Sequence, residues 1–380
     1  MLTPKSLDSL TSFRHTLHQN PELSGQESAT IERLIGYIQS IAPEATLEKI
    51  GQGLLAIFKG SEAGSTTMIR AELDALPISE INDLEYASNV EGVSHKCGHD
   101  GHMAIVAGLV HLLAENPVKK GKVILLFQSA EETGQGARWM LEDPAFEPYR
   151  PDFVFALHNL PCYPLGQALL KVGTFCAASI GLKIQLLGTT AHASHPETGK
   201  SPAGALSRLA PLMAAIPQAE GAFNDFVLVT VTHLNLGEPT FGVSPGAGEI
   251  WLTLRAYQDH DLSQLKSLIR IEADRIAKGE GLEVTYTYHE AFDATINHQQ
   301  EVSRIKKIAE KQGLKVGHLE APNRWSEDFG LFLQKSQGAM FGLGSGLHQP
   351  ALHNPDYDFP DALLPTGTSL FWGLIQELNY

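Results

Sequence analysis

The sequence is poor in cysteine, in long apolar runs and in clustered positive charge. Its 380 residues include three cysteines, Cys97, Cys162 and Cys176. This odd and sparse set argues against a disulfide framework and favours a reducing compartment. No apolar stretch approaches the ~20 residues of a membrane span. The formal net charge is -15 without any block of lysine and arginine, so we expect neither nucleic acid nor an anionic membrane as a partner.

The composition predicts a globular protein, and the N-terminal segment bears on its location. The N-terminal segment lacks the contiguous apolar core of a secretory signal, so we expect the cytoplasm as its location. Apolar residues make up 43% of the chain and charged residues 19%, which is ordinary for a globular fold. The length is enough for two domains.

Two successive patterns of apolar residues predict those two domains. Up to residue 175, strand-like runs alternate with helical ones, which predicts an α/β domain whose mainly parallel sheet is sandwiched by helices. Residues 176–289 follow the order β-α-β-β-α-β, which is typical of a ferredoxin-like α+β domain. The first pattern resumes over 290–380. We therefore predict a larger domain formed by 1–175 and 290–380, with a smaller domain, 176–289, inserted into it.

Two adjacent carboxylates, Glu131 and Glu132, follow the apolar run 122–127. Open α/β sheets place their chemistry at the carboxyl ends of such strands. One carboxylate can bind a metal while its neighbour moves a proton. The alternative is a solvated helix start, because acidic residues are favoured in the first turn of a helix.

The segment SHKCGHDGH, residues 94–102, concentrates possible metal ligands. Cys97 and His99 alternate, so an extended turn can point both side chains the same way. Thiolate and imidazole are good ligands for a borderline transition metal. The alternative is a helix N-cap at Asp100 with incidental histidines.

Two further histidines stand where the same metal site could reach them. His158 follows the apolar strand 153–157, which we place in the same sheet as the strand before the glutamates. His353 lies in a loop rich in turn-forming residues, and His348 competes with it in the same loop. Loops at sheet ends hold binding residues disproportionately.

These side chains together predict a site for two divalent metal ions bridged by a water. A pair of ions ~3.5–4 Å apart polarises a carbonyl and lowers the pKa of a bound water from 15.7 to about 7. One glutamate would be a ligand, and the other would take the water's proton and deliver it to the leaving amine. Such a site hydrolyses an amide or similar acyl bond. The remaining candidate ligands are Cys97, His99, His158 and His353.

Several motifs run in order along nearly the whole chain: FRHTLHQNPELSGQE, IRAELDALPI, CGHDGH, FQSAEETGQGA, ALHN, AHASHPETG, WSEDF and LHNPDYDF. In this order they resemble the amidohydrolase branch of the zinc metallopeptidase superfamily, which includes aminoacylase, carboxypeptidase G and succinyl-diaminopimelate desuccinylase. The chain looks most similar to hippurate hydrolases, plant indole-acetyl-amino-acid hydrolases and N-acetyl-diaminopimelate deacetylases. CGHDGH followed by AEE is highly specific.

The resemblance implies a role for each residue of the site. Glu131 is implied as the general base, and His353 is preferred over His348. The implied substrate is an N-acyl amino acid, with an acetyl, benzoyl or similar acyl group, or a short peptide. The implied ligands of two divalent ions (zinc, manganese, cobalt or nickel) are Cys97 as a bridge, His99, Glu132, His158 and His353.

The inserted domain resembles the lid and dimerisation domain of the family, so we expect a homodimer through it. His192 matches a lid histidine that stabilises the tetrahedral oxyanion, often across the dimer. Arg255 matches an arginine thought to meet the substrate carboxylate, which a bidentate guanidinium fits well. The alternatives are an exposed strand-end histidine at His192 and a strand-edge charge pair at Arg255.

The chain departs from the family pattern at a few positions. Glu72 stands where the family has aspartate before Asp74, and its extra methylene is expected to rearrange a hydrogen bond behind the site. In the lid, Glu197 replaces a histidine, Ser201 an aspartate, and Gly242 begins a segment that in the family starts with asparagine. The resemblance therefore implies an intact metal centre and an atypical surface toward the substrate.

Three alternative functions stay open. A dipeptidase or aminopeptidase of the same superfamily would be favoured if Glu197 reached the site and bound a substrate ammonium group. A cysteine hydrolase could use Cys97 and His99, although the other ligands would then have no role. A binding protein without catalytic activity could share the same fold.

Overall fold

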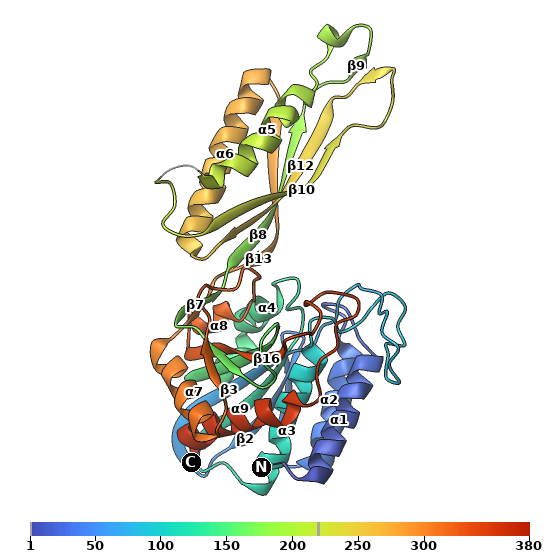
Figure 1. Cartoon of the computed structure of the whole chain (residues 1–380). Coiled ribbons are helices and arrows are strands. Elements are labelled where there is room, and N and C mark those ends of the chain that lie inside the picture. Colours follow the sequence, from blue (N-terminus) through green and yellow to red (C-terminus); the bar gives the residue numbers. More distant parts are fainter. Residues whose placement is uncertain (1, 219–220) are drawn as a thin grey trace. The chain divides into compact units, whose positions relative to one another are not determined.

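The chain folds into two compact units (Figure 1). The computed structural model describes residues 2–218 and 221–380. The first unit contains the described residues up to 175 together with 295–321 and 328–380, and the second contains those of 176–294 together with 322–327. The segments 290–294 and 322–327 were predicted with the larger domain but group with the second unit. Phe292 pairs with Ser179, and the N–H of Ala177 donates to the carbonyls of Asn323 and Trp325.

A sheet of eight strands forms the centre of the first unit, in the order β1-β2-β4-β3-β5-β16-β6-β15. The neighbours β4, β3, β5 and β16 run parallel, which confirms the predicted fold class. A two-stranded sheet pairs β7 with β14. The strands are Thr46–Ile50 (β1), Gly53–Lys59 (β2), Glu62–Glu72 (β3), Lys120–Gln128 (β4), Phe153–Pro161 (β5), Ala168–Leu170 (β6), Gly173–Cys176 (β7), Thr295–Asn297 (β14), Val316–His318 (β15) and Gln337–Gly346 (β16).

Both faces of the large sheet are buried. Successive side chains of a strand point to opposite faces, and Leu54 and Leu55 of β2 are both inaccessible to solvent. Leu54 packs in a core shared with α1, α2, α3, α7 and α9, whereas α4 and α8 pack against β4 and β16. The helices are Pro4–Gln19 (α1), Ser28–Ile41 (α2), His99–Glu115 (α3), Gly136–Glu142 (α4), Gln299–Lys311 (α7), Gly330–Leu333 (α8) and Leu363–Asn379 (α9), with a 3-10 turn at Pro144–Tyr149.

The second unit has a four-stranded antiparallel sheet in the order β10-β12-β8-β13. This order is the one that a ferredoxin-like chain produces, as predicted. Alternate residues of β8 and β12 pack in one core with α5 and α6. The elements are Ala178–Leu187 (β8), Ala191–His192 (β9), Ala203–Ala215 (α5), Val227–Leu236 (β10), Val243–Ser244 (β11), Ala247–Ala256 (β12), Asp259–Glu280 (α6) and Glu283–Phe292 (β13), with 3-10 turns at Pro196–Thr198 and Ile216–Gln218. No described helix of either unit is long and apolar enough to cross a membrane.

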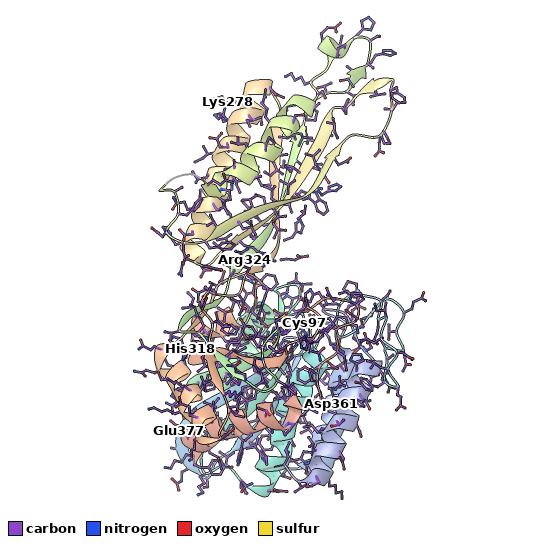
Figure 2. The ribbon with its side chains drawn as sticks, in the orientation of Figure 1. Cys97, Lys278, His318, Arg324, Asp361 and Glu377 are labelled. Carbon is purple, nitrogen blue, oxygen red and sulfur yellow. The ribbon has the colours of Figure 1, made fainter. Side chains whose placement is uncertain are left out.

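A buried cluster of charges fastens α1 to the start of α3. The Asp100 carboxylate accepts hydrogen bonds from Arg14 Nη1 at 2.9 Å and from His18 Nδ1 at 2.8 Å. His18 Nε2 lies 3.0 Å from Glu80, and Arg14 Nε donates to Asp361, which is labelled in Figure 2. Burial lowers the pKa of His18, but Asp100 and Glu80 outweigh this effect and raise its pKa to about 9. The first turn of α3 is thereby held in place by ionised partners.

Gly101 lies in the first turn of α3 beneath the ring of Phe359. A Cβ at this position would lie 2.3 Å from a ring carbon. Because overpacking of a tight contact costs about 1–3 kcal/mol, we expect Gly101→Ala to lower the free energy of unfolding by that amount in urea denaturation. The control is Gly36→Ala in α2, where nothing lies within 4 Å; it should raise the free energy of unfolding by about 0.5–1 kcal/mol. Equal effects of the two changes would contradict this packing.

The charged form of His18 should make stability depend on pH. Its pKa is raised to about 9, so its stabilisation is fully present below the ordinary pKa of about 6.5 and is lost as the pH rises through 9. We expect His18→Gln to be less stable than the unmodified chain at about pH 6.5 and to lose less stability toward about pH 9.5. His260→Gln, an exposed histidine of α6, is the control. Urea denaturation at both pH values measures this, and identical pH dependence with and without His18 would refute it.

Candidate metal centre

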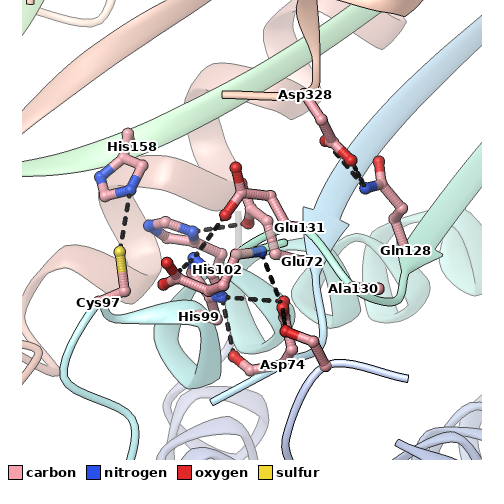
Figure 3. A network of polar contacts seen from close by, with 12 residues as sticks. Glu72, Asp74, Cys97, His99, His102, Gln128, Ala130, Glu131, His158 and Asp328 are labelled. Atoms are coloured by element: carbon pink, nitrogen blue, oxygen red, sulfur yellow. Dashed lines mark hydrogen bonds and ion pairs between the residues drawn. The ribbon is translucent and has the colours of Figure 1, made fainter. Parts of the chain in front are cut away.

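The candidate ligands of the first unit meet where parallel strands end. Figure 3 shows Cys97, His99, Glu131 and His158 close together there. Glu131 and Glu132 follow β4, and His158 lies in the carboxyl-terminal half of β5. His99 is the first residue of α3. The carboxyl ends of parallel strands share one edge of a sheet, so residues far apart in sequence lie side by side there. Cys97 Sγ is 3.5 Å from His158 Nε2.

Two groups of possible ligands share one residue. The ligand atoms of Cys97, His99 and His158 lie within 4.8 Å of one another, and so do those of Cys97, Glu132 and His353. His353 Nε2 is 3.6 Å from a Glu132 oxygen. Because the Cys97 sulfur belongs to both groups, two ions could be held with the thiolate between them.

The structure distinguishes His353 from His348, the two histidines of one loop that were both possible metal ligands. His353 belongs to one of these groups, whereas the exposed His348 belongs to no such group among residues 2–218 and 221–380. The N–H of His353 donates to the carbonyl of Lys96 at 2.9 Å, and the buried Lys96 ammonium donates to the carbonyl of Tyr357 at 2.8 Å. These bonds join the His353 loop to the residue before Cys97.

Hydrogen bonds fix which ring nitrogen each buried histidine presents to the site. His99 Nδ1 donates to the Asp74 carbonyl at 2.8 Å, and His158 Nδ1 donates to the Asn159 carbonyl at 2.9 Å. The Nε2 atom of each ring then carries the lone pair that a metal needs. His99 Nε2 is buried with no hydrogen-bond partner among the described residues, and it lies 3.9 Å from Glu132.

His158 was predicted at the end of its strand, but it lies inside it. β5 continues to Pro161, and His158 pairs with Gly342 of β16. The sequence after His158 hides this because Pro161 and Cys162 resemble a loop. The pairing places His158 within a strand of the central sheet, with 2% of its surface exposed.

The site concentrates negative charge around His99. Burial lowers the pKa of this imidazole, but its bond to Asp74 and the charges of Glu72 and Glu132 outweigh burial and raise the pKa to about 10. One oxygen of Glu132 is buried without a hydrogen-bond partner among the described residues. Surroundings that hold a proton this strongly also favour a cation in its place. The thiolate, imidazole and carboxylate donors fit a borderline divalent ion such as zinc.

A buried network behind the site was missed by the sequence patterns. Glu72 is bonded to Arg70 and accepts from His102 Nδ1 at 2.7 Å, and His102 Nε2 lies 2.5 Å from the Asn159 side chain. Arg70 also donates to Asp328 at 2.7 Å. Glu72 thus reaches two partners at once, Arg70 and His102. An arginine inside the apolar strand 67–71 was the available signal, because a buried guanidinium needs paired carboxylates.

His192 and Arg255 belong to the second unit, whereas the candidate ligands belong to the first. His192 is exposed at the end of β9, and its Nδ1 accepts from the N–H of Ser194 at 3.1 Å. Arg255 lies on the inner strand β12 and donates to the Arg324 carbonyl and the Ser326 hydroxyl. No carboxylate of the described residues lies within ion-pair distance of Arg255, so a strand-edge charge pair does not explain it. Glu197 and Gly242 are exposed in the same unit.

Comparison with known proteins places this geometry in a family. The family described as Peptidase family M20/M25/M40 matches residues 68–377. A hippurate hydrolase of Campylobacter jejuni is 30% identical, over 97% of each chain. An N-acetyldiaminopimelate deacetylase of Bacillus subtilis is 32% identical, over 96% of this chain and 98% of its own.

A solved structure from Bacillus subtilis, described as a dinuclear metal binding peptidase from the M20 family, superposes with a TM-score of 0.84 at 26% identity, covering 98% of both chains. The match in fold and the match in sequence agree over nearly the whole length, as the motifs predicted. The chain therefore belongs to the peptidase family M20/M25/M40, and it is a metal-dependent hydrolase that acts on amide bonds.

Proposed function

We propose that this chain hydrolyses the amide bond of N-acyl amino acids, with Glu131 as the general base. The observation that carries the proposal is the sharing of Cys97 between two groups of metal ligands. Glu131 stands beside both groups, with one oxygen 4.0 Å from His99 Nε2. This arrangement resembles what two-ion hydrolysis requires, namely ligands for two neighbouring ions and one further carboxylate that can take a proton from a bound water.

We assign the ligands by the groups to which they belong. Glu132 shares a group with Cys97 and His353, whereas Glu131 shares a group with His99 and Glu132 but none with Cys97. We therefore take Glu132 as a ligand and Glu131 as the base. Zinc, manganese, cobalt and nickel all accept this donor set, and the Cys97 thiolate favours zinc among them. The proposed ligands are Cys97 as a bridge, His99, Glu132, His158 and His353.

The mechanism gives Glu131 two proton transfers. Divalent ions bound here would polarise the substrate carbonyl and lower the pKa of a nearby water. Glu131, with 4% of its surface exposed, accepts the proton of that water and then passes it to the amide nitrogen as the bond breaks. Its burial keeps the carboxylate away from bulk solvent, so the same proton can be delivered to the leaving group.

The names of several relatives support the proposed substrate class. A hippurate hydrolase, an N-acetyldiaminopimelate deacetylase and an N-acetyl-L-cysteine deacetylase all appear among them. Each name denotes cleavage of the bond between an acyl group and the nitrogen of an amino acid. We therefore propose an N-acyl amino acid with a small acyl group, such as acetyl or benzoyl, as the substrate.

We propose that Arg255 binds the carboxylate of that substrate. Burial lowers the pKa of Arg255, and its partners are a carbonyl and a hydroxyl, which leave its charge uncompensated. Such a guanidinium favours a carboxylate ligand, since an uncompensated and partly buried charge is costly.

We further propose that His192 stabilises the oxyanion from a partner chain. Because Nδ1 of His192 accepts the Ser194 N–H, its Nε2 carries the proton and can donate to an oxyanion. The homodimer would form through the second unit, where the edge strand β10 exposes Leu234 and Leu236. An exposed edge strand with apolar side chains favours pairing with another chain.

Glu131→Gln should abolish most of the hydrolysis without releasing the metal ions. The amide keeps the size of the carboxylate but cannot accept the proton, so we expect kcat to fall by about 10²–10⁴-fold. The rate is measured on N-acetyl and N-benzoyl amino acids and on free dipeptides, with zinc, manganese, cobalt or nickel added. Glu142→Gln, at the exposed end of α4, is the matched control and should leave the rate unchanged.

Removal of the metal ions is the second arm of the same experiment. A chelator should stop hydrolysis, and adding one of the four ions back should restore it. The reason is that the proposed reaction needs a water activated by metal ions and does not use Cys97 as a nucleophile. Activity that survives the chelator would favour a cysteine hydrolase. A normal rate in Glu131→Gln would exclude Glu131 as the base, and no hydrolysis of any N-acyl amino acid would overturn the proposed function.

A further inference from the structure

The turn that carries Glu131 and Glu132 has an unusual backbone at its first residue. Ala130 has a φ of 51°, in the left-handed region that favours glycine. Its carbonyl accepts from the N–H groups of Gln135 and Gly136, so the chain reverses sharply here. A residue with a side chain keeps such a conformation only where its surroundings enforce it.

Two carboxylates from other segments hold this turn on either side of Glu131. The N–H of Ala130 donates to Glu27 Oε1 at 2.7 Å. The N–H of Glu132 donates to Asp74 Oδ2 at 2.9 Å. Both acceptors are buried, with 3% and 1% of their surface exposed. The Ser129–Ala130 and Glu131–Glu132 peptide groups, which flank Ala130 and Glu131, are therefore both fixed by hydrogen bonds from outside the turn.

Glu27 is an unexpected residue to find buried at this point. It occupies the N-cap position of α2 but makes no capping hydrogen bond with its side chain. No cation of the described residues forms an ion pair with it. Burial, and to a smaller extent the charge of Asp74, raises its pKa to about 7 despite the Ala130 bond. A buried carboxylate without a countercharge is costly, and the hydrogen bond from the Ala130 N–H offsets part of that cost.

We propose that Glu27 is a positioning residue, which holds the Ala130 peptide in its left-handed conformation and thereby aims Glu131 and Glu132 at the metal centre. This inference rests on the proposed roles of Glu131 and Glu132. Without an acceptor at Glu27, the Ala130 peptide can rotate and both carboxylates move relative to His99 Nε2, from which they now lie 4.0 and 3.9 Å. The acceptor oxygen, not the charge, is what the turn requires.

The test compares three substitutions at Glu27 in the full chain. Glu27→Gln keeps an acceptor oxygen at the same reach, Glu27→Leu removes it, and Glu27→Asp withdraws it by one methylene. The readouts are kcat and KM on an N-acyl amino acid that the unmodified chain hydrolyses, and a Co²⁺ titration followed by the thiolate-to-cobalt absorption of Cys97. Urea denaturation of each variant reports the folded state.

We expect Glu27→Leu to lower both kcat and the affinity for the more weakly bound Co²⁺ by about 10–100-fold, with little change in KM. Glu27→Gln should restore both quantities to within about threefold, and Glu27→Asp should fall between the two. The matched control is Glu22→Leu. Glu22 lies in the same segment and accepts the N–H groups of Ala29 and Thr30 at the start of α2, so its loss should lower stability and leave kcat and Co²⁺ binding unchanged.

Each outcome decides for or against the role of Glu27. Normal kcat and Co²⁺ binding in folded Glu27→Leu would overturn it, and so would equal losses in the glutamine and leucine variants. If Glu27→Leu does not fold, the comparison of Glu27→Asp with Glu27→Gln decides, since both keep a polar side chain. If the unmodified chain hydrolyses no substrate, the proposed function fails, but the Co²⁺ titration still tests Glu27.

Discussion

The parallel strands β4, β3 and β5 end side by side at one edge of the sheet, and the placement of the candidate ligands depends on this. Asp74 follows β3, the two glutamates follow β4, and His158 lies near the end of β5. The hydrogen bonds between these strands set their register, so the positions of their carboxyl ends relative to one another are fixed. Two further segments must meet these strand ends: the start of α3, which brings Cys97 and His99, and the loop after β16, which brings His353.

Buried charges then hold α3 and the turn after β4 in position. Asp100 joins α3 to α1 through Arg14 and His18, and Arg70 joins β3 to Asp328. Each of these groups would be costly if unpaired inside the fold. The pairs therefore act less as a source of stability than as a means of fixing geometry, because breaking one leaves an uncompensated charge.

The sequence alone predicted the fold class, the family and the candidate metal ligands that the structure brings together, because these depend on local patterns. Apolar runs mark the strands, and Cys97 with His99 and the paired glutamates stand directly at helix starts and strand ends. Contacts between distant segments could not be predicted in this way. Glu27 meets a residue 103 positions later, and no periodicity links them. β16 was not predicted as a strand, because its glycines weaken strand propensity.

The shared use of Cys97 by two ions is the central claim, and anomalous diffraction from crystals grown with zinc or manganese tests it most directly. We predict two anomalous peaks per chain, with the sulfur of Cys97 at coordination distance, about 2.3 Å for zinc, from both. His99 and His158 should lie beside one peak, and Glu132 and His353 beside the other. A single peak, or two peaks of which either is out of reach of Cys97, would contradict it.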